Sequence, residues 1–479
     1  MAHVHRTYQP RDTDHSVLHT VLREHLAPFL KEVSARGDGH GLPRFVEQEF
    51  REFLTCGVLA HGFTRLRCAD CAFERLLPFS CKRRGFCPSC GGRRMAERAG
   101  YLVDEVLPRV PVRQWVLTLP YRLRYRLAWD HALCRAVLGV YARVLLAFYA
   151  RTARAHGIRD CQTGTVTVIQ RFGSGLQLNI HFHTLVLDGV FSDAPPARLT
   201  FHPAPPPSDE DVAQVLATVR ARVGRLLARR RLEPADDTAR ADPLAETSPV
   251  LSGLVGASVQ GRVALGPRAG VRVRRLGDEP DLGHATSRGP RQAQLDGFDL
   301  HANVWVPPND RARLEQLCRY LLRPPLAQDR VHLADGRVPV TLKTVWRDGT
   351  SHLLFEPIEF MEKLAAIIPR PAINLLLHHG VLAPRAAWPL PTRARCPHVA
   401  PGFQFLSDLA GGDGGRFRVR GPGCQAGYGV HAREPFVRCP IGGKVVPGRG
   451  DFRGDAALVL HGVGHWKLAA TTCSWQVRR

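Results

Sequence analysis

The sequence predicts an α+β fold in which an antiparallel sheet is flanked by helices and preceded by a small cysteine-rich module. Residues 164–191 hold two β-branched or alternating runs joined by Gly173-Ser174-Gly175, which is typical of a β-hairpin. Residues 131–157 and 309–325 repeat apolar side chains with a helical period. Cysteines gather between residues 56 and 90, in a basic stretch interrupted by glycines.

The balance of charge indicates a polyanionic partner. The chain of 479 residues carries 66 Lys+Arg against 43 Asp+Glu, a formal net charge of +23. A GC-rich genome accounts for part of the arginine content but not for the shortage of acidic residues, so nucleic acid is the expected partner. There is no uncharged apolar run long enough to span a membrane, and the first residues lack the apolar core of a secretory signal. We therefore expect a protein of the reducing cytoplasm, with cysteines that are metal ligands or buried thiols.

Four parts follow one another along the chain. We expect an N-terminal helical segment at 1–52, kinked or divided at Pro28, a zinc-ribbon-like module at 53–100, a main domain at 101–400 and a poorly patterned tail at 401–479. The main domain carries a basic insertion near 192–300. Its expected elements are helices at 131–157, 210–234, 309–325 (N-cap Asn309 or Asp310) and 358–370, a strand at 298–307, and hairpins at 164–191 and 338–357, the latter turning at Asp348-Gly349.

The cysteine spacing predicts a structural zinc site. Cys68 and Cys71 form one CxxC knuckle and Cys87 and Cys90 a second, with 15 residues between them. Two such knuckles supply four thiolates in the tetrahedral arrangement that Zn²⁺ prefers. Further candidate ligands are Cys56, His61 and Cys81. Several arginines surround the knuckles and are either DNA contacts or a solvated face: Arg83, Arg84, Arg93 and Arg94.

Two histidines on alternate residues suggest a second metal site. His181 and His183 project from the same face of the second hairpin strand, because successive side chains of a strand point to opposite faces. Two imidazoles can hold a divalent ion that polarises a phosphate, although such pairs are often merely hydrogen-bonded. Tyr320, between Arg319 and Arg323, is a candidate nucleophile or an ordinary packed tyrosine.

Several motifs together resemble the rolling-circle HUH transposases of the insertion sequence 91 family. They are FSCKRRGFCPSCGGRRM, VRQWVLTLPYRLRY, IQRFGSGLQLNIHFHTLVLDGVF, LCRYLLRPPLAQDRV and FEPIEFMEKLAAIIPRPAINLLLHHGVLAP. The resemblance implies an HUH endonuclease-type sheet and a single-strand DNA endonuclease and strand transferase. In it, His181 and His183 would hold Mg²⁺ or Mn²⁺, and Tyr320 would form a 5′-phosphotyrosine. The freed 3′-hydroxyl would prime host replication.

Some positions leave alternatives open. The resemblance implies a third polar metal ligand, for which Gln170, Gln177 and Asn179 are candidates. Pro324 stands four residues after Tyr320, where some relatives carry a second tyrosine, and Tyr121 and Tyr125 are interpreted as structural or DNA-facing. The alternative functions are an HUH replication initiator or relaxase, and a catalytically inactive zinc-dependent DNA-binding remnant.

Overall fold

The computed structural model describes residues 16–386 except 38, 69–73, 195–196, 233–241, 278–288 and 347, together with residue 388 and four short strands between residues 437 and 478. The chain divides into two units. One comprises Met1–His15, Glu52–Lys82 and Arg395–Arg479, and the other comprises Ser16–Arg51 and Arg83–Ala394. Helices and antiparallel sheets are mixed along the chain, as the sequence predicts.

The larger unit is built on a six-stranded sheet in the order β10-β11-β3-β6-β5-β14, and its neighbouring strands are all antiparallel. The predicted hairpin is confirmed as the neighbouring strands β5 and β6 of this sheet, where Gln170 pairs with His181 and Val168 with His183. The strands are β3 (Val112–Thr118), β5 (Gly164–Phe172), β6 (Leu178–Leu187), β10 (Gln292–Leu295), β11 (Phe298–Val306) and β14 (Leu376–Gly380).

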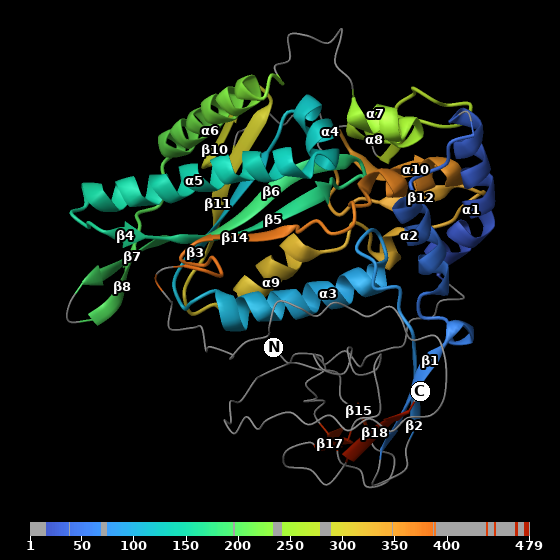
Figure 1. Ribbon diagram of the computed structural model, residues 1–479, viewed down its shortest axis with the longest axis horizontal. Helices are drawn as coiled ribbons and strands as arrows, with labels where there is room; N and C mark the ends of the chain where they lie inside the picture. Colours follow the sequence, from blue (N-terminus) through green and yellow to red (C-terminus); the bar gives the residue numbers. More distant parts are fainter. Residues whose placement is uncertain are drawn as a thin grey trace. The chain divides into compact units, whose positions relative to one another are not determined.

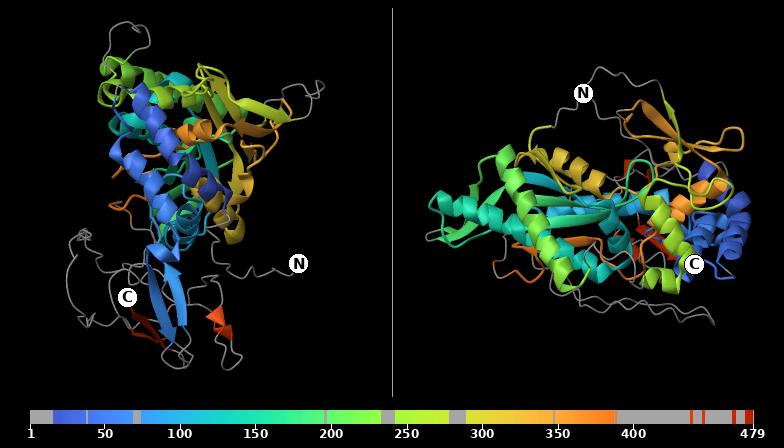
Figure 2. Two further views of the ribbon diagram at one scale, coloured as in Figure 1. Left: turned by 90° about the vertical axis from the view of Figure 1, so that its right-hand side faces the viewer. Right: turned by 90° about the horizontal axis from the view of Figure 1, so that it is seen from above.

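Helices cover both faces of this sheet (Figures 1 and 2). On one face, α5 (His131–Ala155) places Tyr141 against Phe182 of β6, and α6 (Asp209–Arg229) packs beside it. On the other face, α9 (Arg311–Leu322) lies beside α3 (Pro88–Tyr101). By length and hydropathy alone α5 could cross a membrane, but 61% of its most apolar window is buried here, as in a core helix.

The remaining elements of this unit pack around one end of the sheet or extend from its strands. Pro28 lies inside α1 and does not divide it, since the helix runs from Val17 to Arg36. The basic insertion expected near 192–300 contains a helix, α8, whose Leu251 and Leu254 are buried. The elements are α1 (Val17–Arg36), α2 (Arg44–Thr55), π-helix η2 (Leu102–Val106), α4 (Tyr121–Trp129), β4 (Cys161–Gln162), β7 (Gly189–Ala194), β8 (Ala197–Pro203), α7 (Pro243–Thr247), α8 (Pro249–Val259), β9 (Arg274–Gly277), 3₁₀-helix η3 (Gln328–Arg330), β12 (Val338–Thr341), β13 (Thr350–Phe355) and α10 (Pro357–Ile367).

The smaller unit contains a sheet in the order β17-β18-β1-β2. A strand of the predicted tail therefore pairs with the cysteine module, because β18 is antiparallel to β1. Its described elements are 3₁₀-helix η1 (Leu59–His61), β1 (Phe63–Cys68), β2 (Glu74–Pro78), β15 (Val437–Arg438), β16 (Val445–Val446), β17 (His465–Lys467) and β18 (Ser474–Arg478).

Candidate active site

Two imidazoles of the central strand β6 face each other on the side of the sheet that α9 covers. The Nε2 atoms of His181 and His183 are 3.0 Å apart, and both side chains are buried. Phe182 between them points to the α5 face. Two ligand nitrogens at about 2.1 Å from one ion stand roughly 3.0 Å apart when they subtend about 90°, as neighbouring octahedral ligands do. The spacing of the two imidazoles therefore fits a shared divalent ion.

A chain of hydrogen bonds orients the two rings. His181 Nδ1 lies 2.9 Å from the carbonyl oxygen of Asn179, which requires that Nδ1 carry the proton. His183 Nδ1 lies 2.8 Å from Nε2 of Gln114 on β3. A carboxamide offers a donor and an acceptor, so turning the Gln114 amide over would let it accept from His183 Nδ1–H instead. In that form both Nε2 lone pairs are free for an ion.

Burial keeps both imidazoles neutral. Desolvation is the main cause that lowers the pKa of His181 to about 4, and the charges of Arg323 and Arg124 lower it further. Desolvation also lowers the pKa of His183 well below its usual range, aided by His181 and Arg323. Neutral imidazole is the form that binds metal.

Two candidate third ligands have an oxygen without a hydrogen-bond partner. Within the described part of the chain, Oε1 of Gln170 and Oδ1 of Asn179 are buried and unpartnered. Gln170 stands directly across from His181 on β5, so both side chains share the α9 face, and its Nε2 donates to the Leu321 carbonyl at 3.1 Å. In contrast, Gln177 Oε1 accepts from the Gly175 backbone at 3.0 Å and is engaged in the hairpin turn. A buried acceptor left free beside two imidazoles is a suitable ligand oxygen.

Tyr320 lies against one member of the histidine pair, His183. Its ring is perpendicular to that of His183, with the centroids 6.0 Å apart, and the side chain is 37% exposed. Asp310 caps α9 by accepting from Arg313 N at 2.9 Å, one of the two N-caps expected from the sequence. The Arg323 guanidinium is 4.3 Å and Lys343 Nζ 4.1 Å from the centroid of the tyrosine ring. A hydroxyl nucleophile candidate, two cations and two imidazoles thus meet at one place.

The other arginines singled out in the sequence make local contacts. Arg319 pairs with Glu315 one turn earlier on α9. Near α3, Arg83 Nη2 donates to Gln48 Oε1, Arg84 Nη1 to the Ile373 carbonyl, and Arg94 Nη1 to the Arg83 carbonyl. Arg93 lies in α3. Burial of the Arg84 guanidinium is the main reason why its pKa is lowered. Their contribution to DNA binding stays a prediction.

Candidate zinc ligands lie in both units. In the larger unit, Cys87 is the residue before α3 and Cys90 belongs to its first turn, so one short segment carries both thiols of this CxxC knuckle. In the smaller unit, Cys56 and Cys81 are free cysteines, Cys68 ends β1 and Cys71 lies outside the described residues. Two thiolates of one knuckle can ligate the same ion, and a structural zinc ion takes four ligands. Which of the other candidates complete the site, His61 in η1 among them, stays a prediction.

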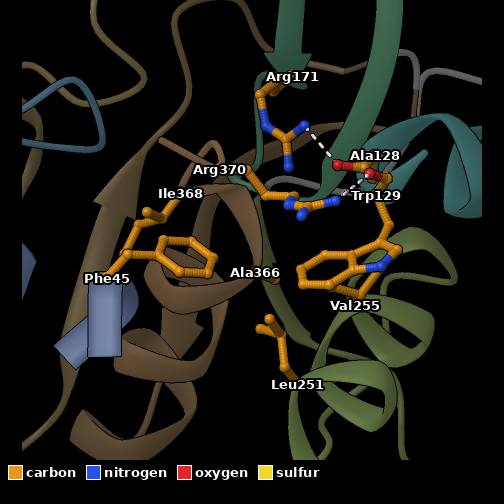
Figure 3. A pocket seen from close by; sticks show the side chains of 9 residues that line it. All are labelled: Phe45, Ala128, Trp129, Arg171, Leu251, Val255, Ala366, Ile368 and Arg370. Atoms are coloured by element: carbon orange, nitrogen blue, oxygen red, sulfur yellow. Dashed lines mark hydrogen bonds between the residues drawn. The ribbon is translucent and has the colours of Figure 1, made fainter. Parts of the chain in front are cut away.

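Arg171 is a buried cation with a structural role. Its Nε donates to the Ile367 carbonyl at 3.1 Å and its Nη1 to the Ala128 carbonyl at 2.9 Å, so it joins the carboxyl ends of α10 and α4. Figure 3 shows it beside Arg370, which stacks on Trp129. The pocket there holds about 10 Å³, which leaves no room for a substrate.

Comparison with known families agrees with the fold and the cysteine site. Residues 21–119 match the "Transposase zinc-binding domain" of IS91 elements, and residues 164–387 match the family described as "Putative transposase". No curated protein and no solved structure matches the chain. The two family matches define a transposase, an enzyme that processes DNA. The chain belongs to the IS91 family of transposases, as its motifs predict.

Proposed function

We propose that this transposase nicks single-stranded DNA at an element end, with Tyr320 as the nucleophile. The observation that supports it most is the placement of Tyr320 against His183, with ring centroids 6.0 Å apart. That contact joins the candidate nucleophile to a pair of neutral imidazoles in a strongly basic protein.

His181, His183 and the oxygen of Gln170 would hold a divalent cation. Two nitrogens and one oxygen suit Mn²⁺ better than Mg²⁺, which prefers oxygen ligands throughout. A bound divalent ion polarises the scissile phosphate and offsets its charge. Gln114 and the Asn179 carbonyl keep the imidazoles oriented for that role.

The covalent step exchanges one ester bond for another. The phenol oxygen of Tyr320 forms a bond to phosphorus and gives up its proton to solvent, while the bond from phosphorus to the 3′ oxygen breaks. The leaving oxygen takes a proton and becomes a free 3′-hydroxyl, and the 5′ end stays on Tyr320. Arg323 and Lys343, beside the ring, stabilise the negative charge that develops on the phenol oxygen and the phosphate.

The products fit rolling-circle transposition. A 5′-phosphotyrosine conserves the energy of the phosphodiester for later strand transfer, and the free 3′-hydroxyl can prime synthesis by the host replication machinery. In this proposal the protein works on the bacterial chromosome, in the nucleoid region of the cytoplasm.

The test is adduct formation with an oligonucleotide that carries the element end. With Mn²⁺, we expect wild type to form a covalent protein–DNA species on a denaturing gel, while Tyr320→Phe and His183→Ala form none. Tyr121→Phe is the matched control, because Tyr121 is an exposed tyrosine on α4. An adduct with Tyr320→Phe would refute the choice of nucleophile. DNA binding by wild type without an adduct on any terminal sequence would favour the inactive remnant.

A further inference from the structure

A groove of about 470 Å³ opens directly beside Tyr320. Three segments line it: the turn of the β5–β6 hairpin, the chain that follows α9, and the connection between β12 and β13. Its lining residues are Phe172, Gly173, Ser174, Tyr320, Arg323, Pro325, Arg330, Lys343, Thr344, Val345 and Trp346. The groove is therefore continuous with the candidate active site.

The charge of the groove suits phosphate. Arg323, Arg330 and Lys343 line it, and none of the described lining residues is acidic. Arg330 is fixed by hydrogen bonds from its Nε to the Thr341 carbonyl at 2.6 Å and from its Nη2 to the Ser174 carbonyl at 3.1 Å. Fixed cations facing a groove of this kind bind a nucleic-acid backbone without reading its sequence.

Trp346 gives the groove an aromatic surface that is held in place. Its Nε1 donates to Ser174 Oγ at 3.1 Å, and the Arg275 guanidinium lies 5.0 Å from its ring centroid. Arg275 is in turn paired with Asp348 at 2.6 Å. The neighbouring Val345 is 59% exposed, so apolar surface continues from the indole toward solvent. Aromatic rings beside cations are the usual platform for unpaired bases, because every base has a face that can stack.

We propose that this groove binds the unpaired nucleotide adjoining the scissile phosphate. The base stacks on Trp346, and Lys343 contacts the phosphate that leads to Tyr320. Duplex DNA does not fit this role, since its bases are stacked on each other and their faces are not free. The position of the bound nucleotide relative to the nick rests on the proposed function, whereas the binding of single-stranded DNA by Trp346 does not.

The first test measures affinity for a single-stranded oligonucleotide bearing the element end, by fluorescence anisotropy in the Tyr320→Phe background. Trp346→Ala is expected to weaken binding about 5- to 150-fold, the range for losing one stacked base. Trp346→Phe keeps an aromatic face and should stay nearer wild type. Trp305→Ala is the matched control, since Trp305 is 39% exposed on β11 and does not line the groove. Equal losses for Trp346→Ala and Trp305→Ala, or no loss for Trp346→Ala, would overturn the proposal.

A second measurement examines the phosphate contact. Lys343→Gln should reduce the slope of log affinity against log salt by about 0.7, the value for one phosphate of a single strand. An unchanged slope would remove Lys343 from the proposal.

A third measurement locates the nucleotide. A 2-aminopurine base next to the nick should be quenched on binding, and Trp346→Ala should abolish that quenching. Quenching that is the same in both proteins would contradict the assignment. If wild type forms no adduct but Trp346→Ala still loses affinity, only the proposed function fails. If adducts form and affinity is unchanged, only the groove fails.

Discussion

Gln170→Leu is expected to weaken Mn²⁺ binding at the histidine pair without destabilising the metal-free protein. The side chain makes one hydrogen bond, from Nε2 to the Leu321 carbonyl, and its Oε1 is buried without a partner. Losing the bond leaves the Leu321 carbonyl without this donor, which costs about 1–3 kcal/mol, and removing a buried unsatisfied oxygen returns a similar amount, about 1–3 kcal/mol. Leucine has a similar volume, so the free energy of unfolding should stay within about 2 kcal/mol of wild type.

In contrast to stability, the affinity for Mn²⁺ should fall strongly in Gln170→Leu. Removing the outer support of a ligand already lowers affinity about 10- to 100-fold, and loss of a ligand should cost at least as much. The assay is isothermal titration of Mn²⁺ into the protein, with chemical denaturation of the metal-free form measured in parallel.

Two further variants decide which oxygen is the ligand. Gln177→Leu is the matched control, because the Gln177 oxygen is bonded in the turn. Asn179→Leu tests the second unpartnered oxygen. Unchanged Mn²⁺ affinity in Gln170→Leu, together with a loss in Asn179→Leu, would show that the reasoning chose the wrong oxygen.

Two other predictions concern the structural sites. Cys90→Ser should abolish stoichiometric zinc, measured by elemental mass spectrometry, whereas Cys161→Ser, outside the zinc-binding module expected at 53–100, should retain it. Equal zinc in both variants would exclude Cys90 as a ligand. Arg113 and Asp188 form a buried ion pair, in which Nε and Nη2 of Arg113 donate to the two carboxylate oxygens at 2.9 and 2.8 Å. Arg113→Met should lower the free energy of unfolding by about 3–5 kcal/mol in chemical denaturation, because it leaves Asp188 charged, buried and without its cation. The double variant with Asp188→Leu should recover most of that loss, and a double variant less stable than Arg113→Met would contradict this account.

The local patterns of the chain predicted much of the fold. Period-two alternation put His181 and His183 on one face of a strand, and the hairpin around Gly173 has the predicted pairing. The helix of Tyr320 begins at a predicted cap. Pro28 does not divide its helix, because a helix with Leu22, Leu26 and Phe29 buried against its neighbours is stable despite one missing backbone donor.

The sequence by itself determined the family, the basic character and which residues share a face of each element. These properties depend on residue type and on the side-chain period, which is two residues in a strand and about 3.6 in a helix. Only the tertiary structure decided which elements meet. It brought Gln114 to His183, left the Gln170 oxygen free, and placed Lys343 beside the ring of Tyr320. Gln114 and His183 are 69 positions apart in the sequence, and no local period encodes a distance across a sheet.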